Sequence, residues 1–156
     1  MKVLLASVIM ICATAIPAFA ETVLTVITPE GKTELDWAAL DALPATTVKT
    51  TNDYVDGIHT FTGPRLSEIF GEGKVKEGDE IRLTALNDYA VTLPADDALD
   101  YAVILATTQD GKRMSVRDKG PIWVIYPMSE HPDLRAPVYN DRLIWQLSKA
   151  ELVPAK

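Results

Sequence analysis

The most regular feature of this sequence is an alternation of apolar and polar residues with the period of two that a β-strand requires. It is clearest at residues 80–85, where three apolar side chains alternate with more polar ones and predict one buried and one solvated face. Residues 101–106 and 122–126 are apolar on both faces, which predicts two central strands. The pattern therefore indicates a domain built mainly from β-strands.

Turn residues divide the rest of the chain into further strands and a few short helices. Strands are predicted at residues 23–27, 48–51, 58–61, 89–93, 114–116, 143–147 and 150–153. Helices are predicted at 37–43 with Asp36 as the cap, after Gly63-Pro64, and for one turn from Pro94. Three prolines predict a loop at 127–137. We therefore expect an α+β, mostly β fold in one domain over residues 21–156, with a barrel-like mixed sheet and short helices.

The first 20 residues have the three regions of a cleavable secretory signal peptide. Lys2 precedes an apolar run, and Ala18-Phe19-Ala20 has the small-x-small pattern of a cleavage site. The apolar run is shorter than a bilayer-spanning helix and Pro17 interrupts its end, so no stable membrane anchor is expected. We expect a periplasmic protein that is cleaved after Ala20 and, lacking a twin-arginine pair, is exported before it folds.

Composition narrows the classes of partner and cofactor. Cleavage would remove Cys12, the only cysteine, so neither a disulfide nor a thiolate ligand is expected in the mature domain. With 22 acidic against 15 basic residues the chain is a poor candidate for binding nucleic acid or anionic lipid. His59 and His131 lie in unrelated contexts without the spacing of a zinc or copper site, so no metal centre is expected.

The densest group of candidate binding residues is the turn at 117–121. Arg117 and Lys119 flank Asp118 in this turn, and such a turn can present backbone N–H groups and cations to an anion such as phosphate. Arg135 and Arg142 are candidates for the same site. The pattern alone favours a solvated surface loop, with the anion site as the second interpretation.

Aromatic residues supply the other candidates. Tyr54, Tyr89 and Tyr126 are each predicted at a strand end or a turn, where a ring can line a pocket. Trp123 and Trp145 lie in apolar runs and are predicted to be core residues. The serines lie in no recognisable nucleophile motif, which argues against a serine hydrolase.

Several segments occur in the order of a known family. They are FTGPRLSEIF at 61–70, LTALNDYAVTLP at 83–94, the stretch from ILA at 104–106 to DKGPIWVIYP at 118–127, and RLIWQL at 142–147. Together they span most of residues 58–150 and resemble the molybdopterin-binding domain of sulfite-oxidase-like oxidoreductases, in its short exported bacterial form. The resemblance implies a sulfite-oxidase-like molybdopterin-binding fold, with molybdopterin as its cofactor.

The resemblance also implies site residues, and one of them is missing. In catalytic members a cysteine after an early strand ligates molybdenum, whereas the comparable segment 48–53 has no cysteine. The residues that the resemblance offers to a pterin phosphate are Arg65, Arg117, Lys119, Arg135 and Arg142. It places Tyr54, Asn87 and Tyr89 near the reactive centre of such an oxidoreductase.

Three functions stay open at the level of sequence. The absent cysteine and the export route favour a cofactor-free periplasmic module that binds a small anion or a partner protein, as part of a signalling or redox system. The alternative is a molybdopterin-dependent oxidoreductase of the sulfite-oxidase-like family. A third interpretation is an acidic exported scaffold without a pocket. A resemblance of fold does not decide among them.

Overall fold

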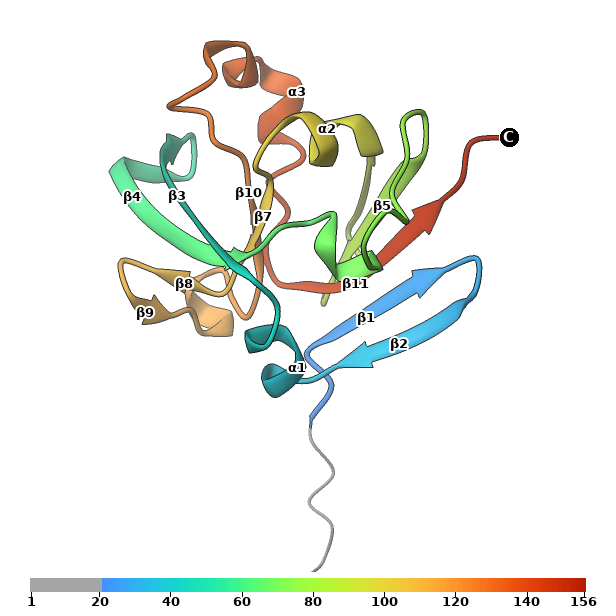
Figure 1. Ribbon diagram of the computed structural model, residues 1–156. Coiled ribbons are helices and arrows are strands. Elements are labelled where there is room, and N and C mark those ends of the chain that lie inside the picture. The colour runs from blue at the N-terminus through green and yellow to red at the C-terminus, as the bar shows by residue number, and fades with distance from the viewer. Residues whose placement is uncertain (1–20) are drawn as a thin grey trace, which may run out of the picture.

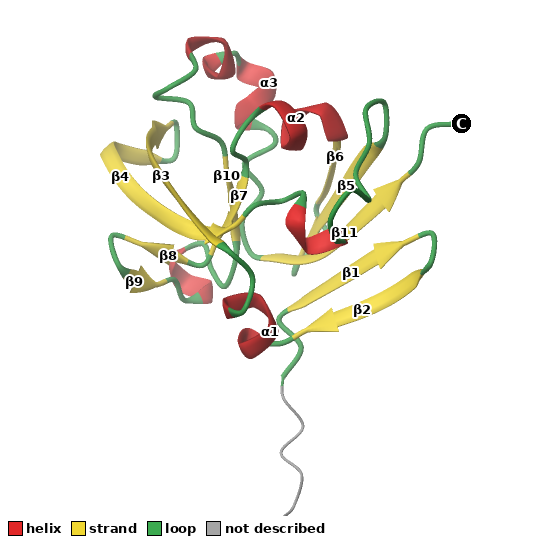
Figure 2. Ribbon diagram, viewed as in Figure 1, coloured by secondary structure: helices red, strands yellow, loops and turns green. Residues whose placement is uncertain are grey.

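Strands dominate residues 21–156, the part of the chain that this computed structural model describes (Figure 2). The predicted signal peptide at 1–20 lies outside the described residues. The strands are β1 (Leu24–Thr28), β2 (Gly31–Leu35), β3 (Ala45–Asn52), β4 (Val55–Pro64), β5 (Glu80–Ala85), β6 (Ala90–Pro94), β7 (Ile104–Ala106), β8 (Thr108–Gln109), β9 (Lys112–Arg113), β10 (Trp123–Ile125) and β11 (Leu147–Val153). The α-helices are α1 (Trp37–Asp41), α2 (Ala95–Asp100) and α3 (Pro137–Asn140), and the 3₁₀ helices are η1 (Glu68–Phe70), η2 (Val116–Asp118) and η3 (Pro132–Arg135). The mostly β, α+β class predicted from the alternation is confirmed.

A five-stranded sheet holds both ends of the described chain. Its strand order is β2-β1-β11-β5-β6, in which β1 and β11 are parallel and the other neighbours are antiparallel (Figure 1). In β5, Ile81 and Leu83 are fully buried while Glu80 and Arg82 are exposed, as the period of two predicts, but Thr84, predicted on the solvated face, is buried. Asp36 caps α1 by accepting a hydrogen bond from the N–H of Ala39, which confirms the predicted cap.

The two strands predicted to be central separate two hydrophobic clusters. Strands β7 and β10 pair with each other between the five-stranded sheet and the four-stranded sheet β3-β4-β8-β9 (Figure 1). In β10, Val124 faces the larger cluster, whereas Trp123 and Ile125 face the smaller one with Phe61. Because both faces of these strands are buried, apolar residues occupy every position, as predicted.

The barrel-like closure expected from sequence is wrong. In the described residues the strands form three separate sheets, and none of the three closes on itself. β7 and β10 pair over only three residues each, and a single β-bridge between Arg65 and Ile104 is the pairing that links β7 to the end of β4. Beyond this short pairing the segments are joined by separate backbone hydrogen bonds, such as those from Thr107 to Thr62 and from Val124 to Ile144, so no continuous ladder closes around the core.

Several predicted elements differ from those observed. Residues 63 and 64 end β4, and only the 3₁₀ turn η1 follows, although Leu66, Ile69 and Phe70 are buried as the helical pattern required. Residues 114–116 form no strand, and the predicted loop at 127–137 contains η3 and the first residue of α3. Residues 143–146 are not a strand because Gln146 has a φ of 52°, which a continuous strand cannot adopt.

No helix among residues 21–156 has the length and hydropathy needed to cross a bilayer.

An ion pair between His59 and Asp110 links β4 to the β8–β9 turn and predicts a raised pKa for His59. His59 Nδ1 lies 2.6 Å from Asp110 Oδ2, while Asp110 Oδ1 accepts a hydrogen bond from the N–H of Thr60. The hydrogen bond to Asp110 raises the pKa of His59 above the ordinary 6.5, and the bond from Thr60 is the largest cause of a lowered pKa at Asp110. The contribution of His59 to stability is therefore complete below pH 6.5 and is lost as the pH rises through its raised pKa.

Titration of the His59 ring followed by NMR tests this pair. We expect a midpoint above 6.5 in the wild-type protein and a lower midpoint in Asp110→Asn, whose amide oxygen can still accept from Thr60. His59→Gln assigns the resonance. Equal midpoints in the wild type and Asp110→Asn would show that the pair does not form in solution.

Candidate functional site

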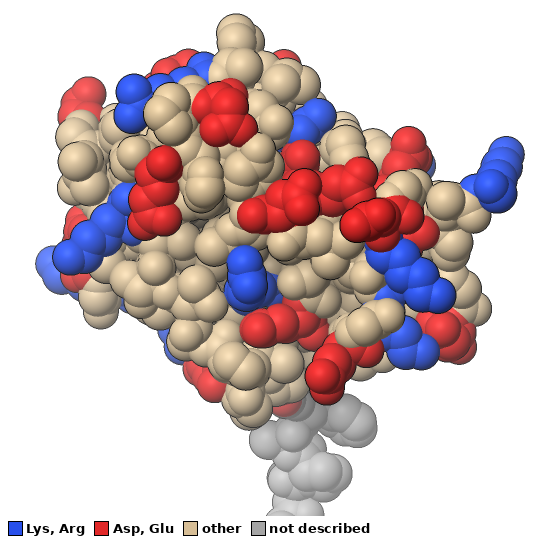
Figure 3. Space-filling view, turned by 45° about the horizontal axis from the view of Figure 1, so that its top comes forward, with Lys and Arg blue, Asp and Glu red and all other residues tan. Residues whose placement is uncertain are grey.

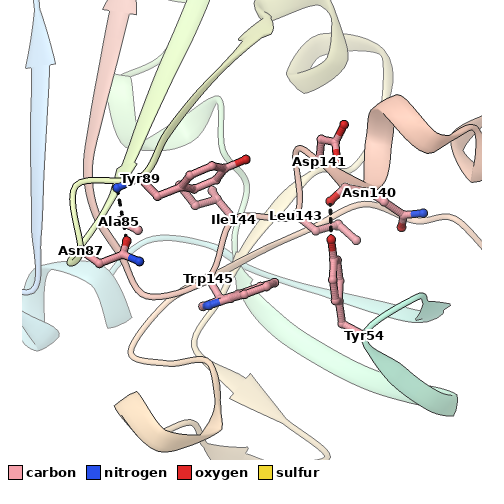
Figure 4. Close-up of a pocket in the computed structure, with 9 residues that line it drawn as sticks. All are labelled: Tyr54, Ala85, Asn87, Tyr89, Asn140, Asp141, Leu143, Ile144 and Trp145. Atoms are coloured by element: carbon pink, nitrogen blue, oxygen red, sulfur yellow. Dashed lines mark hydrogen bonds between the residues drawn. The ribbon is translucent and has the colours of Figure 1, made fainter.

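A cavity of about 300 Å³ opens between the β3–β4 turn, the β5–β6 turn and the segment that follows α3 (Figure 4). Its lining residues are Tyr54, Ala85, Asn87, Tyr89, Asn140, Asp141, Leu143, Ile144 and Trp145. We call it the aromatic cavity, because three of its walls are the rings of Tyr54, Tyr89 and Trp145. The structure thus brings together Tyr54, Asn87 and Tyr89, three predicted site residues that are distant in sequence. Their role in binding stays a prediction.

The β5–β6 turn holds Tyr89 at the edge of the cavity. The side-chain oxygen of Asn87 accepts a hydrogen bond of 3.2 Å from the N–H of Tyr89, and Ala85 N–H donates to the carbonyl of Tyr89 at 2.8 Å. Asp88 between them has a φ of 65°, a left-handed conformation that aspartate tolerates better than most residues. These contacts explain why the pair Asn-Asp forms the predicted turn.

The β3–β4 turn holds Tyr54 against α3. Asn52 Oδ1 accepts a hydrogen bond of 2.9 Å from the N–H of Tyr54, and the Tyr54 hydroxyl donates to the carbonyl of Asn140 at 3.5 Å. The side chain of Asn140 donates in turn to Asp53. The ring of Tyr54 meets that of Trp145 edge to face, with centroids 5.0 Å apart and an angle of 74°. Two turns and the segment after α3 therefore fix the three rings relative to one another.

The electrostatic environment of the aromatic cavity is negative. Among the described residues its lining contains the carboxylate of Asp141 and no lysine or arginine. Partial burial raises the pKa of Tyr54, and the nearby charges of Asp141 and Asp53 raise it further. On the face drawn in Figure 3, which does not label the cavity, acidic side chains form a band right of centre with basic side chains beside and among them.

The predicted anion-binding cations lie elsewhere. Arg117 is exposed on η2, and the ammonium of Lys119 lies over the ring of Trp123, 5.1 Å from its centroid. Arg65 donates to the carbonyl of Tyr101 at 3.3 Å. Lys119 and Arg65 thus make contacts within the fold, Arg117 is exposed, and none of the three lines the aromatic cavity.

The other two predicted cations are engaged by protein acceptors. Arg142 pairs with the buried carboxylate of Asp97, which also accepts a hydrogen bond of 2.8 Å from Tyr126. Arg135 donates to the carbonyl of Met128 and lines a smaller cavity of about 180 Å³ that borders residues 51–53. Tyr126, a candidate for lining a pocket, is instead fully buried, because its hydroxyl finds its acceptor inside the core. Burial raises the pKa of Tyr126 well above its usual value.

Sequence reasoning missed Trp145, Asn140 and Asp141. Trp145 was expected in the core as part of a strand, yet the residue is 37% exposed and its ring forms one wall of the aromatic cavity. Gln146 turns the chain, since its N–H donates to the carbonyl of Lys119 and its φ is left-handed. No local sequence signal distinguishes this outward tryptophan from a buried one, because the run around it is apolar.

The described residues do not fit a molybdopterin site of the predicted kind. Segment 48–53 has no cysteine, and in it the buried Thr50 hydroxyl donates to Thr51 O and accepts from the N–H of Ser129, both at 3.1 Å. Within residues 21–156 no cluster of three or more His, Cys, Asp or Glu side chains is arranged to hold a metal. The five predicted cations contribute none of the lining of the aromatic cavity and one residue, Arg135, to the smaller cavity. Segment 48–53 therefore offers no thiolate to a metal, and the five predicted cations do not meet around either of these two cavities.

Comparison with known proteins bears on the fold. No protein-family model and no curated protein matches the chain. Among solved structures, the sulfane dehydrogenase SoxCD from Paracoccus pantotrophus is similar, with a TM-score of 0.62 and 16% sequence identity over 83% of this chain. The match spans 37% of the length of the SoxCD chain. At this identity the likeness concerns the fold alone, and it gives weak support to the sulfite-oxidase-like fold implied by the sequence segments.

Proposed function

We propose that this protein is a periplasmic binding module of sulfite-oxidase-like fold that takes a small ligand in the aromatic cavity. The observation that carries the proposal is the convergence of Tyr54, Tyr89 and Trp145 around one opening of about 300 Å³. These three residues are 38%, 53% and 37% exposed, respectively. Large aromatic side chains are usually buried, and rings left accessible around a concave site are typical of ligand-binding surfaces.

The location in the periplasm rests on the signal-peptide pattern of residues 1–20. The ligand proposed for this cavity differs from the small anion of the sequence-based hypothesis. The cavity lining offers a carboxylate and no cation, so a small anion would meet repulsion there without a compensating charge.

The second candidate function is a molybdopterin-dependent oxidoreductase of the sulfite-oxidase-like family. The similarity of the fold to that of SoxCD favours this candidate. Because one fold can host several activities, the similarity does not establish this one. The absence of a thiolate in segment 48–53 and the dispersed cations oppose it.

Purification from the native periplasm separates the two candidates. We expect less than a tenth of a molybdenum atom and of an oxidised pterin per chain, measured by mass spectrometry of the metal and by pterin fluorescence. A sulfite-oxidase-like enzyme that has the cysteine ligand, purified in the same way, serves as the positive control. Stoichiometric molybdenum and pterin would overturn the binding-module proposal and favour the oxidoreductase.

A further inference from the structure

The three rings of the aromatic cavity are arranged as the walls of a cage. Figure 4 shows the indole of Trp145 flat below the opening, the ring of Tyr54 upright at one side and Tyr89 at the other. The near-perpendicular contact of Tyr54 with Trp145 gives a corner between two ring planes. Ring faces carry negative electrostatic potential, so several faces around one small space attract a cation.

The charges around the cavity favour the same ligand. Asp141 lines the opening and Asp53 precedes Tyr54 in the β3–β4 turn, and both carboxylates contribute to the raised pKa of Tyr54, whose largest cause is burial. Arg142, the neighbour of Asp141 in the chain, pairs with Asp97 instead of lining the cavity. No lysine or arginine is among the described residues that line this opening.

The polar groups that line the cavity include hydrogen-bond acceptors. The amide of Asn87 faces the turn, where its oxygen accepts from Tyr89, and the hydroxyl of Tyr54 donates to the carbonyl of Asn140. The cavity thus offers ring faces, a carboxylate and tyrosine oxygens, and it offers no ammonium or guanidinium donor to an anion.

We propose that the aromatic cavity binds the ammonium group of a small organic ligand, held against the faces of Tyr54, Tyr89 and Trp145 and balanced by Asp141. The inference rests on the proposed binding function and specifies its ligand class. A volume of about 300 Å³ suits a ligand of few heavy atoms, at the lower end of the range for small-molecule sites.

Choline and two molecules of the same shape test the charge. The neutral isostere is 3,3-dimethylbutan-1-ol, and the matched anion is 3,3-dimethylbutanoate. Binding is measured by calorimetry and by the shift of the Trp145 indole N–H resonance in NMR spectra. We expect choline to bind at least tenfold more tightly than the neutral isostere, and the anion to cause no shift at the same concentration. Equal binding of choline and the isostere, or a preference for the anion, would overturn the inference and leave the cavity as a ligand site.

Matched variants locate the binding. Trp145→Leu removes an aromatic face and is expected to weaken choline binding at least fivefold, whereas Trp145→Phe retains a face and most of the affinity. Asp141→Asn is expected to weaken choline threefold or more without changing the affinity of the neutral isostere. Trp37→Phe, at a ring covered by Arg113 at 4.1 Å, is expected to leave binding unchanged. Unaltered choline binding in Trp145→Leu would place the ligand elsewhere.

The two proposals fail in different ways. Absence of binding by all three probes would overturn the ammonium inference and remove the support that the aromatic cavity gives to a small-ligand site. Stoichiometric molybdenum and pterin in the purified protein would overturn the binding module whatever the probes show. Circular dichroism and thermal unfolding of each variant exclude loss of the fold as the cause of lost affinity.

Discussion

Replacing Asp97 with alanine is expected to lower the free energy of unfolding by about 3–5 kcal/mol, the cost of leaving a buried charge without its partner. The side chain of Asp97 is 9% exposed, and its carboxylate accepts a hydrogen bond from Arg142, whose side chain is 15% exposed. The same oxygen accepts the hydroxyl of Tyr126 at 2.8 Å, and Tyr126 is fully buried. The variant therefore leaves one cation and one hydroxyl unpaired in the interior.

Loss of the Asp97–Arg142 pair should also affect ligand binding in the aromatic cavity. Arg142 precedes Leu143 and Ile144, which line that cavity, and the carbonyl of Leu143 accepts from the indole of Trp123. Releasing Arg142 from α2 loosens the start of this segment. We therefore expect Asp97→Ala to weaken any ligand of the cavity, even under conditions in which the variant is still folded.

Chemical denaturation of Asp97→Ala, Asp97→Asn and Asp100→Ala measures the effect. Asp100 is exposed on the same helix, so its variant controls for helix propensity and net charge. Asp97→Asn keeps an acceptor for Tyr126 and loses the charge, and an intermediate loss is expected. If Asp97→Ala lies within about 1 kcal/mol of Asp100→Ala, the buried pair contributes little and this account of the core is incorrect.

Gly63→Ala is expected to destabilise the fold by about 3 kcal/mol, at the upper end of the usual cost of overpacking. A Cβ at position 63 would lie 1.9 Å from the carbonyl oxygen of Leu105 and 2.7 Å from its carbon. Both are backbone atoms of β7, so no side chain can rotate to make room. The neighbouring hydrogen bonds, from Leu66 to Val103 and from Thr107 to Thr62, hold the two segments together on either side.

Gly57→Ala is the matched control in the same strand. Gly57 has a φ of 80° and no atom within 4 Å of a Cβ, so its variant incurs only the backbone cost of about 1 kcal/mol. Thermal and denaturant unfolding of both variants should rank Gly63→Ala as the less stable. The reverse order, or equal stability, would mean that β4 and β7 do not approach as closely as the structure shows.

Residue patterns were sufficient for much of the secondary structure. The alternation in β5, the double apolar runs of β7 and β10, and the hairpin turns of β1–β2 and β5–β6 all occur where the sequence predicts them. The helix after Gly63-Pro64 was wrong, because Pro64 closes a strand that must pass close to the backbone of Leu105. The close contact between β4 and the backbone of β7 keeps this segment extended, although the local sequence predicts the start of a helix.

For the candidate site, residue type was a better guide than charge. Tyr54, Asn87 and Tyr89 line one cavity, as their predicted positions at turns allowed, because turn residues lie at the surface where strands end. The five predicted cations do not share this cavity. Arg65 and Arg135 donate to backbone carbonyls, and Arg142 pairs with a carboxylate. Lys119 lies over a ring and Arg117 is exposed. Arginine and lysine side chains are long enough that sequence order does not say where their charges lie.

The sequence by itself determined the features that depend on neighbouring residues: the strand alternation, the capped helix α1, the tight turns and the absence of a cysteine from segment 48–53. Only the tertiary structure decided that Trp145 faces outward, that Asp97 is the partner of Arg142 and Tyr126, and that the cavity is negative. The physical reason is the separation in sequence between the residues that determine each feature. Backbone conformation is set largely by adjacent side chains, whereas a cavity is the space left when segments far apart in the chain pack together.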